Sequence, residues 1–309
     1  QGFQIVLTTI PEKFDMILSK DHPSYSDLPG VWVLIGGLWV AHFAYWGFNQ
    51  YITQRALGAK SLPEAQKGVM FAAFLKLLMP IVVVLPGICA VVLIPQLDSP
   101  DTAYPAMMGL LPSGLLGLTF AALIAAIVSS LASMTNSVST IFTMDIYKQF
   151  LSEQVDERKL VVVGRNVALI SIVVAALCAQ PLLGNLESAF QYIQNFTGFF
   201  TPGILVIFLV ALFWKKATSL SVLVAALASL ILSIAMFMFA PDDFPFQHRM
   251  GIVFLVTGFL CYMTALVQGY TDQEKAVDLN SINFQTSKGF NISTLVILVI
   301  LIIIYSVWW

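Results

Sequence analysis

The sequence predicts an all-α integral membrane protein. Of its 309 residues, 58% are hydrophobic and only 10% are charged, whereas soluble domains carry about 25% charged residues. The mean hydropathy is +0.86, and charge-poor stretches long enough to cross a bilayer recur along the chain. This composition excludes a soluble enzyme and a disordered chain. A net charge of −2 gives no basic excess for a nucleic acid, so no such partner is expected.

Eight stretches are apolar enough to form spanning helices, each needing roughly 20 such residues. In the third, Pro105 and Pro112 indicate that the first ten residues form a loop. The eight predicted spans are Val31–Gln54, Gly68–Leu97, Thr102–Met144, Asn166–Leu186, Ser188–Trp214, Ala217–Pro241, Gly251–Tyr270 and Gly289–Trp309.

Lysine and arginine residues predict the orientation of these spans. Eleven of the 15 lie in loops on one side of the predicted membrane, three lie on the other side, and Lys76 lies within a span. Cytoplasmic loops carry the excess of positive charge, so the loop Arg55–Lys67 is expected to be cytoplasmic. Both ends of the chain are then extracytoplasmic.

The first span carries His42, Tyr45, Trp46 and Asn49 at i, i+3, i+4 and i+7, which places them on one helical face. Aromatic rings beside hydrogen-bonding groups suit a flat, hydroxyl-rich ligand. Ordinary packing, or an aromatic belt at the membrane interface, explains the same pattern equally well.

The second span contains Lys76, the clearest case of an ionisable residue at membrane depth. A charge at membrane depth costs about 2.5–3.5 kcal/mol on insertion scales, so a function is expected for it. The ammonium either faces a wet cavity, where it donates to substrate oxygens, or snorkels to the interface on its long stem.

The third span carries a stripe of small and hydroxyl residues, Ala126, Ser129, Ser130, Ser133 and Ser137. Hydroxyl and main-chain carbonyl oxygens are ligands for a small alkali cation, and sodium needs no carboxylate there. The alternative is close helix packing, which small residues allow.

The fifth span places Glu187, Gln191 and Gln194 at i, i+4 and i+7, followed by Thr201-Pro202-Gly203. Amides at membrane depth are costly unless paired or wet. The pattern indicates a helix that bends or unwinds beside a cavity; a proline kink with its amides paired to neighbouring helices is the alternative. The chain contains no nucleotide-binding, metalloprotease or lipase motif.

Four segments in order resemble the sodium/solute symporter family, and in particular its sugar-transporting branch, with the bacterial sodium/galactose and sodium/glucose cotransporters. The third, AALIAAIVSSLASMTNSVSTIFTMDIYK, closely resembles the corresponding helix of the family, and the four segments in order make the resemblance specific. The segments are Gly36–Leu57, Ala65–Pro80, Ala121–Lys148 and Ala189–Leu205.

The resemblance implies a LeuT-type transporter, in which two inverted five-helix repeats hold substrate and sodium near the midplane. Residues 1–29 would form an extracytoplasmic segment, residues 30–214 the second inverted repeat with five spans, and residues 215–309 three C-terminal spans. The first repeat would belong to the same protein, so the chain is expected to be its C-terminal portion.

The resemblance also assigns binding roles. The main-chain carbonyl of Ala126 and the hydroxyls of Ser129 and Ser130 would bind the co-transported sodium ion. Lys76 and Gln194 would bond the sugar hydroxyls. The remaining three assignments fall on the first span: Tyr45 as the inner-gate ring that stacks on the sugar, Trp46 beside it, and His42 at a sugar-contacting position that is asparagine in the galactose transporter.

The function implied is sodium-coupled symport of a sugar such as galactose or glucose, by alternating access, in the bilayer of the cell inner (plasma) membrane. Such a protein is a transporter and not an enzyme. The alternatives are a symporter of another small solute (myo-inositol, sialic acid, proline or pantothenate) and a symporter-like membrane sensor domain.

Overall fold

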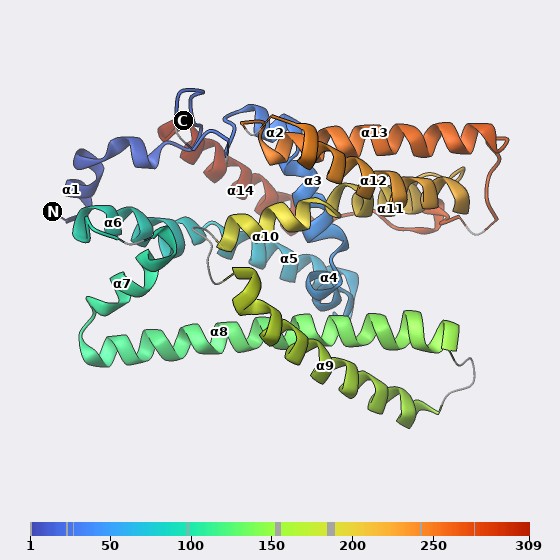
Figure 1. Ribbon diagram of the computed structural model, residues 1–309, viewed down its shortest axis with the longest axis horizontal. Coiled ribbons are helices and arrows are strands. Elements are labelled where there is room, and N and C mark those ends of the chain that lie inside the picture. The colour runs from blue at the N-terminus through green and yellow to red at the C-terminus, as the bar shows by residue number, and fades with distance from the viewer. Residues whose placement is uncertain are drawn as a thin grey trace. The chain divides into compact units, whose positions relative to one another are not determined.

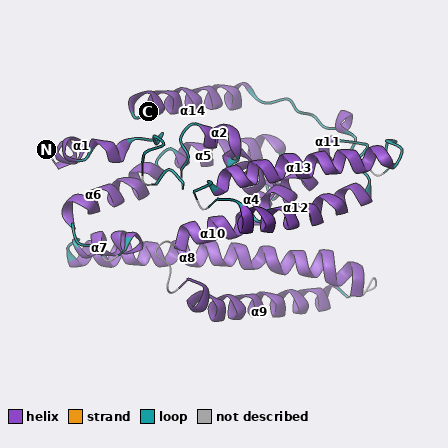
Figure 2. Ribbon diagram, turned by 45° about the horizontal axis from the view of Figure 1, so that its top comes forward, coloured by secondary structure: helices purple, strands orange, loops and turns teal. Residues whose placement is uncertain are grey.

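The computed structural model describes residues 2–22, 24–26, 28–97, 99–151, 156–183, 189–241, 243–274 and 276–309. Over these residues every regular element is helical, as predicted (Figure 2). The chain divides into two compact units, one formed by Gln1–Leu78 with Ile193–Trp309 and the other by Met79–Tyr192.

In its described residues, the first unit contains seven helical elements before residue 78 and four long helices after residue 200 (Figure 1). The early elements are α1 (Gly2–Thr9), the 3₁₀ helix η1 (Pro11–Phe14), α2 (Trp32–Gly36), α3 (Leu38–Phe43), the π-helix η2 (Ala44–Phe48), α4 (Gln50–Leu57) and α5 (Leu62–Lys76). The later ones are α11 (Thr201–Phe213), α12 (Ser219–Phe239), α13 (Phe246–Val267), η6 (Leu279–Ser281) and α14 (Lys288–Val307).

The second unit is built from two long helices and several short ones. They are the π-helix η3 (Pro80–Val84), α6 (Leu85–Leu93), η4 (Pro100–Thr102), α7 (Ala103–Gly109), α8 (Ser113–Thr140), the π-helix η5 (Ile141–Leu151) and α9 (Glu157–Leu183). Helix α10 (Ala189–Gly198) contains the boundary between the units, which falls after Tyr192.

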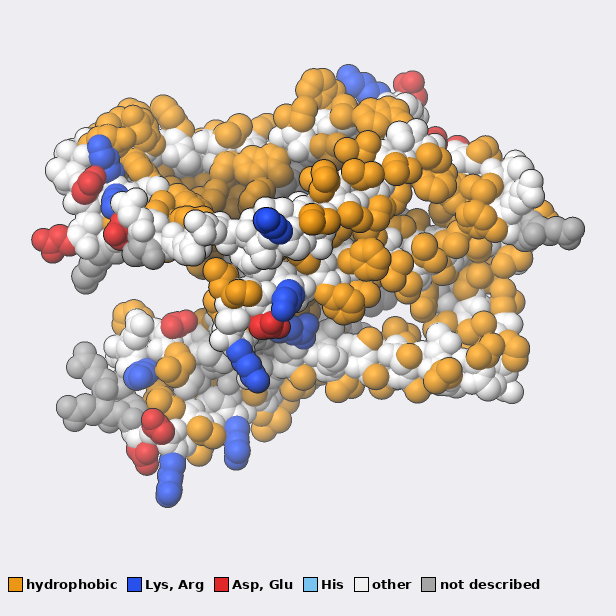
Figure 3. Space-filling view, turned by 180° about the vertical axis from the view of Figure 1, so that it is seen from behind, with side chains coloured by type: hydrophobic (Ala, Val, Ile, Leu, Met, Phe, Trp, Pro, Cys, Tyr) orange, Lys and Arg blue, Asp and Glu red, His pale blue; other side chains and the backbone are white. Residues whose placement is uncertain are grey.

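Six helices among the described residues are long and apolar enough to cross a membrane, and the pair α10 and α11, bent by 45°, makes a seventh candidate. Hydrophobic side chains spread over much of the face in Figure 3, as lipid contact requires. These helices confirm a multi-pass membrane protein. They correspond to seven of the eight predicted spans.

The remaining predicted span, Val31–Gln54, is helical but is divided into α2, α3, η2 and α4, none longer than eight residues. It turns at Gly37 (φ −140°) and again at Asn49, whose ψ of 116° is extended. Hydropathy identified this segment as apolar, but hydropathy carries no information about such turns.

A second difference lies at the start of the third predicted span. The loop expected there is the short helix α7, followed by a turn at Leu110–Leu111 and the start of α8 after Pro112. Pro105 sits within the first turn of α7, where a helix has no need of its missing N–H. The prediction of a loop was therefore wrong.

The bend predicted near Thr201-Pro202-Gly203 is confirmed. Helix α10 ends at Gly198, a turn follows at Phe199 and Phe200, and α11 starts with Pro202 in its first turn. Proline is favoured there because its fixed φ suits a helix start.

The core of the first unit holds the divided segment in place. Val40, Ala44 and Leu205 form a buried cluster, and the Phe48 ring stacks on Phe208 with centroids 4.8 Å apart. Val40, Ala44 and Phe48 recur every four residues, so this face of α3 and η2 packs on α11. The opposite face, with Tyr45 and Trp46, stays exposed within this unit.

Helices α12 and α13 pack along a line of small residues, and Figures 1 and 2 both show them side by side. Small side chains let helix backbones approach closely where no hydrophobic effect drives association. The buried residues, spaced every four, are Ser221, Ala225, Ser229 and Ser233 on α12 and Val253, Thr257, Cys261 and Ala265 on α13.

An exposed ion pair joins the α11–α12 connection to the loop after α13: Lys215 Nζ lies 3.4 Å from Asp278 Oδ1. Two hydrogen bonds lower the pKa of Asp278: the larger effect comes from the backbone N–H of Asn280 and the smaller one from the Lys215 ammonium. A lowered pKa in the folded state adds stability above the carboxyl's unfolded pKa, and this stability is lost as pH falls.

We therefore expect Asp278→Asn to lower Tm slightly at pH 7, with the difference from wild type shrinking in thermal scans at falling pH. A difference that grows on acidification would contradict this role.

Candidate functional site

Four side chains of the first unit form a continuous line of contacts, here called the aromatic–lysine row: Tyr51, Tyr45, Trp46 and Lys76. The Tyr45 and Tyr51 rings lie 5.9 Å apart at 72°, and their hydroxyls are hydrogen-bonded to each other. Tyr45 and Trp46 lie 5.0 Å apart at 85°. These are the edge-to-face arrangements that aromatic quadrupoles favour.

Lys76 completes the row from another helix. Its Nζ lies 4.8 Å from the centroid of the Trp46 ring, within the roughly 6 Å at which a cation is attracted to an aromatic face. The structure thus directs the lysine at the aromatic residues that the sequence singled out. Their exposed faces and the ammonium together offer a ring surface and a strong hydrogen-bond donor.

Local sequence explains the position of Lys76. It is the last residue of α5, where a positive charge complements the partial negative charge of the helix end. Four residues later comes Pro80, which has no N–H to donate to the Lys76 carbonyl. The α-helical pattern therefore stops at this lysine.

The break at Asn49 explains the position of Tyr51. The Asn49 side-chain oxygen accepts a hydrogen bond of 3.3 Å from the Tyr51 backbone N–H, which caps the start of α4. The prediction that Asn49 shares a helical face with His42, Tyr45 and Trp46 is therefore wrong, because the helix stops before it. Asn49 shapes the row instead of lining it.

Two other predicted sugar-site residues, His42 and Gln194, belong to the same unit, and His42 lies close enough to Lys76 for an electrostatic interaction with it. His42 is exposed on α3. Gln194 is exposed on α10, and its main-chain carbonyl accepts a 3.1 Å hydrogen bond from Thr197. Glu187, predicted on the same face as Gln194, lies outside the described residues.

The C-terminal end of α10 packs closely against α13. A Cβ at Gly198, one turn after Gln194, would lie 3.2 Å from Met250 Sδ on α13. The glycine therefore allows α10 to rest closely on α13 where the α10–α11 bend begins.

The predicted sodium ligands Ala126, Ser129 and Ser130 all lie on α8 of the second unit and are exposed there. Ser133 Oγ donates a 3.0 Å hydrogen bond to the Ser129 carbonyl. The described residues contain no group of three or more His, Cys, Asp and Glu side chains placed to hold a metal. A site here would use hydroxyl and carbonyl oxygens, as the sequence suggested.

The C-terminal end of the same stripe has a different role. Ser137 is buried, and Ser139 Oγ donates a 2.7 Å hydrogen bond to the Gly164 carbonyl of α9. Close helix packing, the alternative explanation of the stripe, therefore applies at this end. It does not extend to Ser129 and Ser130, whose surroundings within this unit are open.

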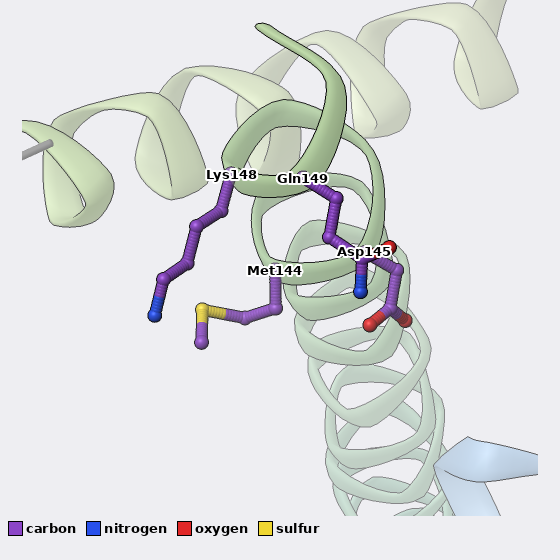
Figure 4. Close-up of a pocket in the computed structure, with 4 residues that line it drawn as sticks. All are labelled: Met144, Asp145, Lys148 and Gln149. Carbon is purple, nitrogen blue, oxygen red and sulfur yellow. The ribbon is translucent and has the colours of Figure 1, made fainter. Parts of the chain in front are cut away.

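A shallow depression at the end of α8 is lined by Met144, Asp145, Lys148 and Gln149 (Figure 4). All four belong to η5, and the close-up shows Lys148 pointing away from Asp145. One segment supplies every lining residue, so nothing converges on a ligand. The depression carries no functional assignment.

Sequence reasoning missed Tyr51. It stands six residues from Tyr45, and in an uninterrupted α-helix such residues lie about 120° apart around the axis. The signal that was available is Asn49, a favoured N-cap residue inside an otherwise apolar span.

Comparisons with a family profile and with individual proteins point to the same family. The profile described as "Sodium:solute symporter family" matches residues 5–232. The chain is 46% identical over its whole length to the sodium/glucose cotransporter of Vibrio parahaemolyticus, of which it covers 60%. Over 99% of its length it is 28% identical to the uncharacterized symporter YidK of Escherichia coli, of which it covers 53%. Over 69% of its length it is 34% identical to human sodium/myo-inositol cotransporter 2, of which it covers 34%. The chain thus spans between a third and three fifths of the length of these relatives.

Proposed function

Because the chain belongs to the sodium:solute symporter family, whose members are transporters rather than enzymes, we propose that the complete natural protein containing it couples sodium entry to the uptake of a sugar. The aromatic–lysine row carries this proposal. A sugar presents one apolar face and a rim of hydroxyls, and the row offers rings with an ammonium beside them. Glucose or galactose is the proposed substrate class, supported by the name of the Vibrio relative.

In this proposal Tyr45 stacks on the sugar ring as the inner gate, with Trp46 beside it. Lys76, Gln194 and His42 bond the sugar's oxygens. Sodium binds the Ala126 carbonyl and the hydroxyls of Ser129 and Ser130, with further ligands from the rest of the complete protein. The first inverted repeat would supply them in a LeuT-type arrangement.

In this proposal, transport across the cell inner (plasma) membrane proceeds by alternating access and is driven by the entry of sodium. Sodium binding favours the outward-open state, sugar completes the occluded state, and loss of sodium to the cytoplasm releases the sugar. Moving one positive charge down 100 mV contributes about 2.3 kcal/mol, and the sodium concentration gradient adds to it. Transport needs no covalent chemistry.

Uptake of radiolabelled glucose and galactose into proteoliposomes holding the complete protein tests this proposal. Accumulation should require an inward sodium gradient and should stop when sodium is replaced by potassium. Folded protein that accumulates neither sugar under any gradient would refute sugar symport.

Sodium-coupled myo-inositol uptake is the second candidate, because several relatives at 34–37% identity are named sodium/myo-inositol cotransporters. Myo-inositol has the same ring size and hydroxyl rim as a pyranose. Competition distinguishes the two: unlabelled myo-inositol should inhibit glucose uptake only at far higher concentration than unlabelled glucose does. The reverse order would make myo-inositol the substrate.

The sodium ligands are tested by Ser130→Ala. Loss of one hydroxyl ligand should raise the sodium concentration for half-maximal uptake about tenfold, corresponding to roughly 1.4 kcal/mol. Ser139→Ala is the matched control on α8, since its hydroxyl bonds α9 instead. Equal sodium dependence in Ser130→Ala and wild type would remove Ser130 from the site.

A further inference from the structure

We propose that Tyr51 is a positioning residue that restrains the Tyr45 ring and thereby sets how fast sugar leaves the site. This inference rests on the proposed function and extends it to a residue outside the predicted site. Its basis is the hydrogen bond between the two phenol hydroxyls, which closes the aromatic–lysine row at the end opposite Lys76.

The backbone is shaped to make this contact. The π-helix Ala44–Phe48 has a wider turn than an α-helix, and Asn49 then breaks the helix with an extended ψ of 116°. Helix α4 restarts under the Asn49 cap, which holds the Tyr51 backbone by its N–H. Tyr51 therefore projects from the first turn of a new helix back toward Tyr45. π-Helical turns are frequently found at functional sites.

Packing holds the backbone on both sides of this contact. Ala44 is buried against Val40 and Leu205, and Phe48 stacks on Phe208. Tyr45 itself is 40% exposed, so its side chain is restrained by its ring contacts and its hydroxyl. The ring contacts are to Trp46 and Tyr51, and Trp46 is in turn covered by Lys76.

The consequence concerns the movement of Tyr45. If this ring must swing for sugar to leave, the Tyr51 hydrogen bond has to break first. One net hydrogen bond of about 0.5–1.5 kcal/mol corresponds to roughly a two- to tenfold change in rate. Tyr51→Phe keeps the ring and removes the hydroxyl, so sugar release should accelerate by about that factor.

A double-mutant comparison in the complete protein isolates the bond. Release of radiolabelled glucose on dilution should be equally faster in Tyr51→Phe and Tyr45→Phe, with no further gain in the double variant, because either change breaks the same bond. The sodium dependence of binding should remain unchanged. Tyr262→Phe on α13 is the control and should release sugar at the wild-type rate. Additive effects, or an unchanged rate in Tyr51→Phe, would overturn the proposal.

A measurement without substrate separates this inference from the proposed function. With 3-fluorotyrosine at position 45, the ¹⁹F resonance should shift and narrow in Tyr51→Phe protein but not in Tyr262→Phe protein. Identical spectra in Tyr51→Phe and wild type would overturn the restraint even if sodium-driven uptake is observed. A shifted spectrum in a protein that moves no sugar would instead refute only the proposed function and the role in sugar release.

Discussion

Replacing Lys76 with alanine is expected to strongly reduce sodium-driven sugar accumulation by the complete protein. The Lys76 ammonium lies 4.8 Å from the Trp46 ring, where it can also donate to a stacked sugar. Loss of a hydrogen bond to a charged group costs about 1.5–3 kcal/mol, or a roughly ten- to 150-fold weaker affinity. Binding of labelled glucose in detergent, together with uptake into proteoliposomes, measures this loss.

The matched control for this variant is Lys67→Ala on the same helix. Lys67 pairs with Glu64 at 2.9 Å, and its side chain is 73% exposed. Such a surface ion pair contributes little to the stability of the fold, so sugar uptake by Lys67→Ala should stay near the wild-type level. Equal loss in both variants would mean that Lys76 acts through helix stability and not through the sugar.

Replacing Gly251 with alanine is expected to lower stability substantially. A methyl group there would overlap the Gly36 carbonyl oxygen and would lie 2.7 Å from the Gly36 carbonyl carbon. Both are backbone atoms, so α13 and α2 must separate, at a cost of about 1–3 kcal/mol for overpacking. Thermal unfolding in detergent should show a lower Tm.

Gly258→Ala on the same helix is the control, since nothing lies within 4 Å of its added methyl group. There the change should be neutral, or stabilising by about 0.5–1 kcal/mol, because alanine is the better helix former. If both glycine variants unfold at the same temperature, the close approach of α2 and α13 is not a constraint on the fold.

The helices that hydropathy predicted well are those whose structure depends on local sequence alone. Helices α8, α9, α12, α13 and α14 are long and continuous, and each contains a long apolar stretch that hydropathy detects. The bend before α11 was also predictable, because Pro202 marks a helix start.

The first span shows where local reasoning stopped. Its apolar composition is that of one long helix, but a π-helix and an Asn49 cap divide it. Packing of Val40 and Ala44 on Leu205 stabilises that course, and such a contact between residues far apart in sequence leaves no periodic signal. The pairing of Tyr45 with Tyr51 depends on this division and was therefore not predictable from spacing.

The candidate site was predictable to a different extent in its two parts. The aromatic residues and Lys76 were singled out by composition and depth, and the structure brings Tyr45, Trp46 and Lys76 together. The serine stripe was ambiguous because packing and ion binding use the same small hydroxyl residues. The structure assigns Ser137 and Ser139 to packing, while sodium binding at Ser129 and Ser130 stays a prediction.

The central claim, sodium-coupled sugar symport, is tested most directly by measuring the effect of sugar on sodium entry and the effect of sodium on sugar entry. Coupling between two ligands is mutual at equilibrium, so proteoliposomes holding the complete protein should take up labelled sodium faster when glucose is present outside. They should also accumulate glucose only under an inward sodium gradient. Sodium-coupled sugar symport would be contradicted if the rate of sodium entry did not change with sugar and the rate of sugar entry did not change with sodium.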